Sequence, residues 1–304
     1  MGPVIDEALR VLERGGLIAI PTETVYGLAA NADDETAVQR VFSVKGRPTD
    51  HPLIVHVAIA DHLGSWAASV PPAAEVLAAT CWPGPLTLLV PAASRVLPVV
   101  TGGRPTVGIR VPAHPLTTQL LEQFSGPTHR GLAAPSANRF GQVSPTSAEH
   151  VQADLGGDVD LILDGGPCPI GVESTIVDCT VDPPQVLRPG GISAETIAEL
   201  LHGRLATAAG PSRASGMLAS HYAPACRVLL AESRAIAEQL ALDVGHGVEV
   251  IDRSDDLVGY ARDLYAILRD ADARGVTTLV AVLPPPAGLG HAIRDRLTKA
   301  AAPR

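Results

Sequence analysis

Glycine and proline occur along the whole length of this chain, and they limit the elements that it can form. The 304 residues include 29 glycines and 27 prolines. Because proline ends helices and glycine weakens them, the helices must be short and the loops many, and a coiled coil is excluded. Hydrophobic residues make up 46% and charged residues 18%, which is typical of a chain that buries a core. At about 100 to 200 residues per domain, the length predicts two domains.

The charge balance argues against a protein that binds nucleic acid. The chain has 23 basic and 32 acidic residues, a net charge of -9, and only 3% aromatic residues. Binding through phosphates needs a basic surface, and stacking on unpaired bases needs an aromatic platform. We therefore expect direct tRNA binding to be weak or absent.

The cysteines and the apolar segments indicate where the protein works. Cys81, Cys168, Cys179 and Cys226 show no C-x-x-C spacing, so we expect free, reduced thiols. We expect no membrane partner, because no segment approaches the roughly 18 apolar residues of a membrane span. The N-terminal residues lack the apolar core of a signal peptide. These features predict a soluble protein of the cytoplasm.

Short apolar segments of the first 200 residues end in hydroxyl or cationic side chains next to glycine or proline. Ligand sites of α/β proteins lie at such strand ends. Hydroxyls, cations and backbone N–H groups freed by glycine favour a site for a nucleoside triphosphate. We expect helices over residues 4–14, 35–44 and 72–80, and strands over 17–20, 53–57, 86–90, 106–111, 131–134, 161–163, 174–179 and 186–187.

One expected strand carries two polar side chains that suit an elongated ligand. Side chains alternate across a strand, so Thr106 and Arg110 share a face. At about 3.3 Å per residue they lie about 13 Å apart, far enough to hold two ends of one molecule.

The lysine count draws attention to one residue. Only Lys45 and Lys299 are lysines, so arginine supplies the other 21 basic residues. Lys45 is expected on a loop with Arg47 and His51, because Pro48 and Pro52 forbid a helix there. An ammonium group can lose its proton when it is desolvated, which a guanidinium cannot do, so Lys45 is the candidate catalytic residue. Lys299, in the last expected helix, is interpreted as incidental.

The last third of the chain has a regular pattern of its own. Residues 202–220 are rich in Gly, Ala, Ser and Arg, and we interpret them as an interdomain linker. Strands at 227–231, 248–251 and 276–283 then alternate with helices ending near 242, 273 and 300, which predicts a small parallel α/β domain. The predicted organisation is a catalytic domain over 1–201, a linker over 202–225 that covers the site, and a C-terminal domain over 226–304.

Seven ordered motifs resemble the YrdC/Sua5 family, the L-threonylcarbamoyladenylate synthases. The resemblance covers nearly the whole chain, since H-Y-A-P at 221–224 and the domain after it are similar to the longer, Sua5-type members. It implies a twisted, open mixed sheet with a concave cavity, followed by a small Rossmann-like domain. The motifs are P-T-E-T-V-Y-G-L at 21–28, K-G-R-P at 45–48 with H-P-L-I-V-H-V at 51–57, W-P-G-P-L-T-L at 82–88, T-V-G-I-R-V-P at 106–112, A-P-S-A-N at 134–138, E-S-T-I-V-D at 173–178 and L-R-P-G at 187–190.

The resemblance also implies an activity. L-threonine, bicarbonate or CO2, and ATP would give L-threonylcarbamoyl-AMP and pyrophosphate, with Mg²⁺ on the phosphates. Downstream threonylcarbamoyl-transferase proteins would then modify adenosine 37 of tRNA. The implied threonine contacts are Thr24, His56, Arg110, Ala134 and Ser174, and the implied ATP contacts are Arg47, His51, Thr106, Ser136, Ser144, Arg188 and Tyr222.

Some implications of the resemblance are less direct. Lys45 matches its K-x-R lysine and is assigned to the phosphates or the carbamate. His51 stands where the family commonly has Asn, and an imidazole can also donate a hydrogen bond. The resemblance assigns no metal ligand on the protein.

Two other functions and one acid/base pair fit the sequence less well than this activity. A module that binds double-stranded RNA or tRNA without chemistry conflicts with the acidic charge. A serine hydrolase using Ser136 lacks a G-x-S-x-G nucleophile elbow. Glu173 and Asp178 are five residues apart on one expected strand, so they would point to opposite faces and form no acid/base pair.

Overall fold

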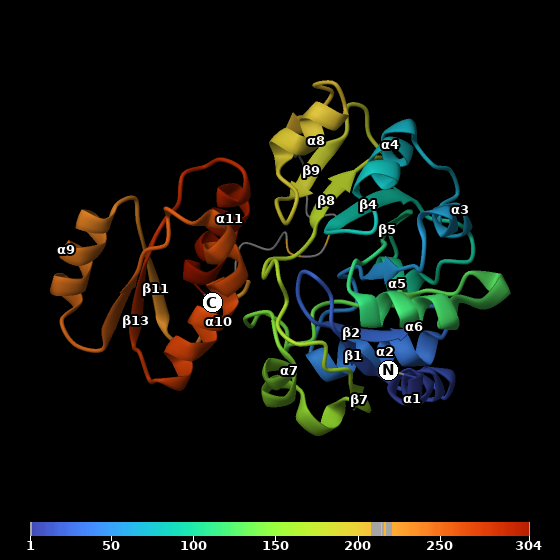
Figure 1. Cartoon of the computed structure of the whole chain (residues 1–304), viewed down its shortest axis with the longest axis horizontal. Helices are drawn as coiled ribbons and strands as arrows, with labels where there is room; N and C mark the ends of the chain where they lie inside the picture. The colour runs from blue at the N-terminus through green and yellow to red at the C-terminus, as the bar shows by residue number, and fades with distance from the viewer. Residues whose placement is uncertain (1, 208–213, 215, 217–220, 304) are drawn as a thin grey trace.

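The computed structural model describes residues 2–207, 214, 216 and 221–303, and these form two parts that lie side by side (Figure 1). The first part is built on a ten-stranded sheet with the order β10-β9-β8-β4-β5-β3-β6-β2-β1-β7. Parallel and antiparallel pairs alternate irregularly in it, so the predicted mixed sheet is confirmed. Its strands are β1 (Ile18–Ile20), β2 (Gly27–Asn31), β3 (Ile54–His56), β4 (Leu86–Pro91), β5 (Thr106–Arg110), β6 (Leu132–Ala133), β7 (Leu161–Ile162), β8 (Thr175–Asp178), β9 (Gln185–Arg188) and β10 (Ala206–Thr207).

The helices of the first part are short, as the glycine and proline content predicts. Prolines start three of them, at Pro72, Pro98 and Pro115, where a missing N–H costs no hydrogen bond. Gly46 ends α2 in the left-handed conformation, with φ 64°. The α-helices are α1 (Gly2–Glu13), α2 (Glu35–Lys45), α3 (Leu63–Trp66), α4 (Pro72–Cys81), α5 (Pro98–Thr101), α6 (Pro115–Ser125), α7 (Ala148–Asp154) and α8 (Ala194–Leu200), and the 3-10 turns are η1 (Ala60–His62), η2 (Gly126–Thr128) and η3 (Gly156–Asp158).

Several elements had no counterpart among the predictions, among them β2, α6 and β10. β2 pairs antiparallel with β1, and its small residues Leu28 to Ala30 show no alternation because both faces are buried. α6 was not predicted either, although it packs on α1. β10 lies inside the predicted linker, where it pairs in parallel with β9 and extends the sheet. Residues 208–213, 215 and 217–220 of that linker lie outside the described residues.

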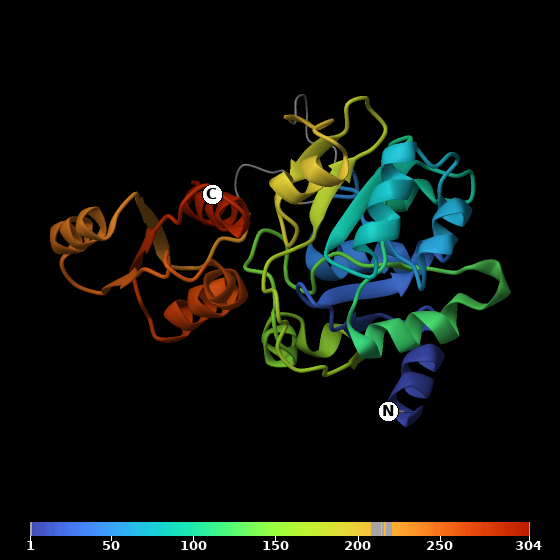
Figure 2. The same cartoon turned by 45° about the horizontal axis from the view of Figure 1, so that its top comes forward.

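The C-terminal part is a three-stranded parallel sheet, as the pattern predicts, and its strand order is β11-β13-β12. Figure 2 shows it from a second direction, with its helices on the two faces of the sheet. None of the described helices is long and apolar enough to cross a membrane. The elements are β11 (Arg227–Ala231), α9 (Arg234–Val244), β12 (Val248–Ile251), α10 (Leu257–Ala273), β13 (Thr278–Val282) and α11 (Leu289–Ala301).

The two parts share a hydrophobic core. Val25, Val143 and Val172 of the first part pack in one cluster with residues of α10 and α11. Gly171 allows the closest approach, because a Cβ there would lie 2.2 Å from the carbonyl oxygen of Arg262 on α10. Its φ of +79° also disfavours any side chain. The loop before β8 therefore touches the backbone of α10 directly.

We predict that Gly171→Ala lowers the free energy of unfolding by about 2 to 4 kcal/mol, because it adds both backbone strain and overlap with a fixed carbonyl. Gly166→Ala is the matched control, since Gly166 has φ +77° in the same loop and open space around it. The control should cost only about 1 kcal/mol. Urea unfolding of both variants measures the difference, and equal losses would contradict a close approach to α10.

Candidate active site

One pocket gathers most of the predicted site residues. It lies where strand ends of the large sheet and the loops after β1 and β6 meet the segment before β11. Eight predicted residues line it, drawn from both the threonine set and the ATP set. They are His56, Arg110, Ala134, Ser174, Arg47, Ser136, Arg188 and Tyr222, and the other lining residues are Thr22, Val25, Gly27, Ile54, Pro135, Glu173, Gly216 and His221.

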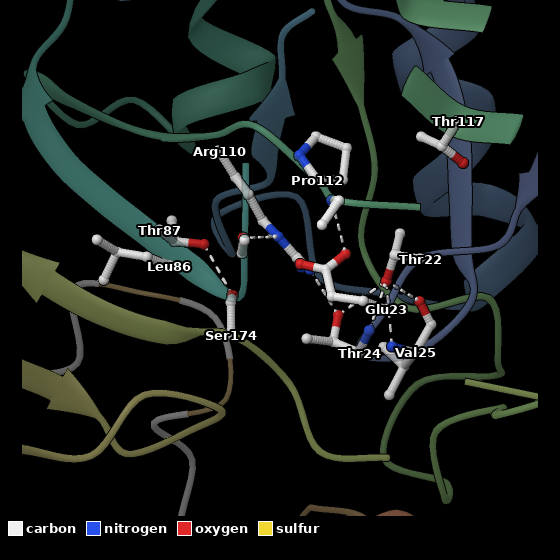
Figure 3. Close-up of polar contacts among 12 residues, drawn as sticks. Thr22, Glu23, Thr24, Val25, Leu86, Thr87, Arg110, Pro112, Thr117 and Ser174 are labelled. Carbon is white, nitrogen blue, oxygen red and sulfur yellow. Dashed lines mark hydrogen bonds and ion pairs between the residues drawn. The ribbon is translucent and has the colours of Figure 1, made fainter. Parts of the chain in front are cut away.

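Arg110, at the end of β5, is oriented by a buried ion pair. Its Nη2 atom donates to Glu23 Oε1 at 2.7 Å and to Thr24 Oγ1 at 2.8 Å (Figure 3). Its Nε atom donates to the carbonyl of Gly84 at 3.3 Å. Thr24 thus acts on the pocket through Arg110 and is not itself among the lining residues. The bonds fix the plane of the guanidinium, the group that binds a carboxylate through two parallel hydrogen bonds.

Glu23 is a site residue that the sequence reasoning missed. Its Oε2 atom accepts the backbone N–H of Ala113 at 3.0 Å, so both carboxylate oxygens are used. Burial alone would raise the pKa of Glu23, but the charge and hydrogen bond of Arg110 outweigh it and lower the pKa. The only signal in the sequence was its position between Thr22 and Thr24 at a strand end.

Arg188 and Ser174 form a second polar group in the lining of the pocket. Arg188 donates to the carbonyl of Ser174 through Nε at 3.1 Å and through Nη2 at 2.9 Å, and to its hydroxyl at 3.0 Å. The hydroxyls of Ser174 and Thr87 lie 2.8 Å apart, as Figure 3 shows. Ser174 therefore links the cation of β9 to β4, the neighbour of β8 in the sheet.

Arg47 adds another cation to the same pocket. Its Nη2 atom donates to the carbonyl of Pro52 at 3.1 Å, and its guanidinium lies 5.8 Å from the ring centre of Phe140. Burial lowers the pKa of Arg47 to about 10, so the group stays charged at neutral pH. Two buried arginines, Arg47 and Arg188, leave this side of the pocket suited to an anion.

Lys45 was predicted to lie on a loop, but it lies at the end of α2. α2 continues through it, because Gly46 and not Pro48 ends the helix. The buried ammonium donates to the carbonyl of Ser136 at 2.5 Å and to that of Asn138. Burial lowers its pKa well below the usual value. Lys45 is not among the residues that line the pocket, and its contact with phosphates or carbamate stays a prediction.

Three members of the predicted ATP set lie away from the pocket lining. His51 is partly buried, with its ring 5.4 Å from that of Phe140. Ser144 is buried and donates its hydroxyl to Glu173 at 2.6 Å. Thr106 begins β5, at the opposite end from Arg110. Their contacts with ATP stay predictions.

A second small pocket continues from the first toward Thr106. Ile54 lines both pockets, and the second is also lined by Gly108. Gly108 lies between Thr106 and Arg110 on the same face of β5. The second pocket has a volume of about 10 Å³, room for no more than one water molecule, so the path from Arg110 toward Thr106 is closed in this structure.

The pocket also holds two buried neutral histidines. Burial, helped by the charge of Arg110, lowers the pKa of His56 to about 3, and burial lowers that of His221 to about 3. Among the described residues, the Nδ1 atoms of both have no hydrogen-bond partner. No three His, Cys, Asp or Glu side chains of the described residues come close enough to hold a metal ion.

The fold and the pocket define a class of protein: an α/β protein whose pocket is lined by three buried arginines, Arg47, Arg110 and Arg188. The chain belongs to the Sua5/YciO/YrdC family, whose model, described as "Telomere recombination", matches residues 10–190. A second model, described as "Threonylcarbamoyl-AMP synthase, C-terminal domain", matches residues 192–302.

The curated relatives and solved structures agree with this assignment. A threonylcarbamoyl-AMP synthase of Pyrococcus abyssi is 42% identical over 95% of this chain and 91% of its own length. One of Bacillus subtilis is 39% identical over 99% and 94%. A crystal structure of P. abyssi Sua5 complexed with L-threonine superposes with a TM-score of 0.90, at 41% identity, over 98% of this chain and 94% of that one.

We predict that the protein loses stability as the pH falls below about 6.5. The unfolded chain binds protons on His56 and His221 near pH 6.5, whereas the folded protein binds them only near pH 3, so acid favours unfolding. Each histidine contributes up to about 1.4 kcal/mol per pH unit.

Urea unfolding between pH 5 and pH 7 checks this dependence. His56→Gln should reduce the slope, whereas replacement of the exposed His246 should leave it as it is. Equal slopes for the wild type and His56→Gln would rule out a buried neutral imidazole at this position.

Proposed function

We propose that this protein joins L-threonine, bicarbonate or CO2, and ATP to form L-threonylcarbamoyl-AMP and pyrophosphate. The observation that carries the proposal is the pocket, in whose lining the oriented Arg110 lies together with the cations Arg47 and Arg188. The similarity to a Sua5 complexed with L-threonine over nearly the full length supports it.

Arg110 binds the carboxylate of threonine in this proposal. Glu23 and Thr24 hold its guanidinium in place, so the fork is already oriented when the ligand arrives. Ala134, Ser174 and the neutral ring of His56 complete that end of the pocket. Because the imidazole of His56 is neutral, it does not compete with the charged guanidinium of Arg110 for the carboxylate of threonine.

The nucleotide occupies the side with Arg47, Ser136, Arg188 and Tyr222. Two guanidinium groups neutralise part of the triphosphate charge, and catalysis then rests on positioning and charge stabilisation. Mg²⁺ belongs to the substrate as MgATP, because phosphate oxygens and water are its usual ligands in such sites.

The reaction needs no nucleophile from the enzyme. The amine of threonine attacks CO2 and loses a proton, which gives a carbamate. A carbamate oxygen attacks the α-phosphorus, and the bond from that phosphorus to the oxygen of pyrophosphate breaks. The protein holds the two anions together and excludes the water that would hydrolyse the labile carbamate. The adenylate then passes to downstream proteins that transfer the threonylcarbamoyl group to tRNA in the cytoplasm.

Pyrophosphate release tests the function directly. With ATP and bicarbonate present, we expect release only when L-threonine is added, with L-threonylcarbamoyl-AMP identified by mass spectrometry. Arg110→Lys should raise the KM for threonine about tenfold or more and leave that for ATP nearly unchanged, because a lysine cannot make the bonds to Glu23, Thr24 and Gly84 and also face the ligand. Arg47→Lys is the matched control, and it should raise the KM for ATP and leave that for threonine nearly unchanged. Release that does not depend on threonine would disprove the proposal.

Lys45→Met should lower kcat by about a hundredfold, since the carbonyls of Ser136 and Asn138 lose their buried donor and the loop shifts. Lys45→Arg keeps a charge but does not fit the same space, so it should not restore activity. Near-wild-type turnover of Lys45→Met would remove Lys45 from the reaction.

A further inference from the structure

Glu173 lines the pocket, yet its carboxylate is bonded to the C-terminal domain. Oε2 accepts the Nε–H of Arg296 at 2.7 Å and the hydroxyl of Tyr265 at 2.8 Å. Oε1 accepts the hydroxyl of Ser144 at 2.6 Å. Burial alone would raise the pKa of Glu173, but Arg296, Arg188 and these hydrogen bonds lower it to about 2. Glu173, which was predicted to form no acid/base pair with Asp178, is a charged group at the junction of the two domains.

Arg296 on α11 is the partner that makes this burial possible. The side chain is 0% exposed, and Nη2 donates to the carbonyl of Pro189 at 3.0 Å, just beyond β9. Its Nη1 atom also donates to the carboxylate of Asp295, the preceding residue, at 2.5 Å. The guanidinium carbon also lies 5.1 Å from the ring centre of Tyr222, within the range of a cation–π contact.

Tyr222 is the pocket residue that depends most on this support. Its φ of 60° is unusual for a residue other than glycine. The ring is 1% exposed and stacks on that of Tyr265, with centres 5.6 Å apart. Arg296 and Tyr265 of the C-terminal domain thus hold Tyr222 in a strained conformation against the pocket.

The same helix also bonds to His221 and Gly216. The carbonyl of Lys299 accepts the N–H of His221 at 3.3 Å, and its ammonium donates to the carbonyl of Gly216 at 2.6 Å. Lys299 also pairs with Asp295 at 2.7 Å. The interpretation of Lys299 as incidental was wrong, because α11 binds the chain at two pocket-lining positions through it.

We propose that Arg296 is a positioning residue for the nucleotide side of the pocket, acting through Tyr222 and Glu173. This inference rests on the proposed function and adds a role for the C-terminal domain. Arg296 supports the ring of Tyr222 and pairs with a carboxylate that would otherwise repel the triphosphate. An unpaired buried charge is far more costly than a neutral pair. Removing the charge of Glu173 therefore separates the neutralisation of that charge from the support of the Tyr222 ring.

Kinetics of four variants test the proposal. Arg296→Met should raise the KM for ATP about tenfold or more and that for threonine less than about twofold, because the stranded carboxylate acts on the triphosphate. The double variant Glu173→Gln with Arg296→Met should bring the KM for ATP back to within about threefold of the wild type, since the stranded charge is gone and the thioether of Met still packs on the ring of Tyr222. Arg296→Lys keeps the positive charge, so among the Arg296 variants it should show the smallest rise in the KM for ATP.

Arg294→Met is the matched control on the same helix, because Arg294 pairs with Glu232 inside the C-terminal domain. It should leave both KM values unchanged. An equal rise in the KM for ATP and threonine in Arg296→Met, or no recovery in the double variant, would show that Arg296 only supports packing and would overturn the proposal. If Arg296→Met does not fold, the double variant and Arg296→Lys provide the test. A KM for ATP more than about threefold above that of the wild type in both variants would then overturn the proposal.

Equilibrium titration with a non-hydrolysable ATP analogue separates this proposal from the function itself. The wild type should bind the analogue more tightly than Arg296→Met by the same factor as the KM values. Equal affinities would reject the positioning role even if threonine-dependent pyrophosphate release is found. Weaker binding to Arg296→Met without such release would keep the positioning role and reject the reaction.

Discussion

The buried ion pair between Glu23 and Arg110 is the interaction on which the pocket depends. It joins residues 87 positions apart, one in the loop after β1 and the other at the end of β5. Neither charge is stable out of water alone, so the two segments must meet for either to be buried. Thr24 and the N–H of Ala113 complete the hydrogen bonds of the pair, and the result is a guanidinium with one orientation. Burial and charge pairing thus set the geometry in which a carboxylate can be recognised.

The same constraint acts again at the other side of the pocket, between Glu173 and Arg296. Here the partners belong to different domains, so burial of the carboxylate requires the C-terminal domain to dock. Apolar packing around Tyr265 and the close approach at Gly171 bring α10 and α11 to the required distance. The C-terminal domain is consequently part of the pocket's structure and not an appendage joined by a linker.

Local sequence signals predicted most of the elements, because helix and strand periodicity depends on neighbouring residues. The alternation in the C-terminal part predicted β11 and β12 with their observed bounds. The predictions failed where tertiary contacts decided the outcome. β2 is a strand because its small residues are buried on both faces. Lys45 lies in a helix because Gly46, not the more visible Pro48, ends it.

The sequence by itself determined the α/β class, most of the two domains' secondary structure and the polar strand ends, since periodicity and the spacing of Gly and Pro are local properties. It also supplied half of the residues that line the pocket. Only the tertiary structure decided which charges pair. Glu23 with Arg110 and Glu173 with Arg296 are far apart in the chain, and no local pattern distinguishes a buried, paired carboxylate from a solvated one. The roles of Lys299 and Tyr222 likewise follow from the docking of α11, because a contact between two domains exists only once both have folded.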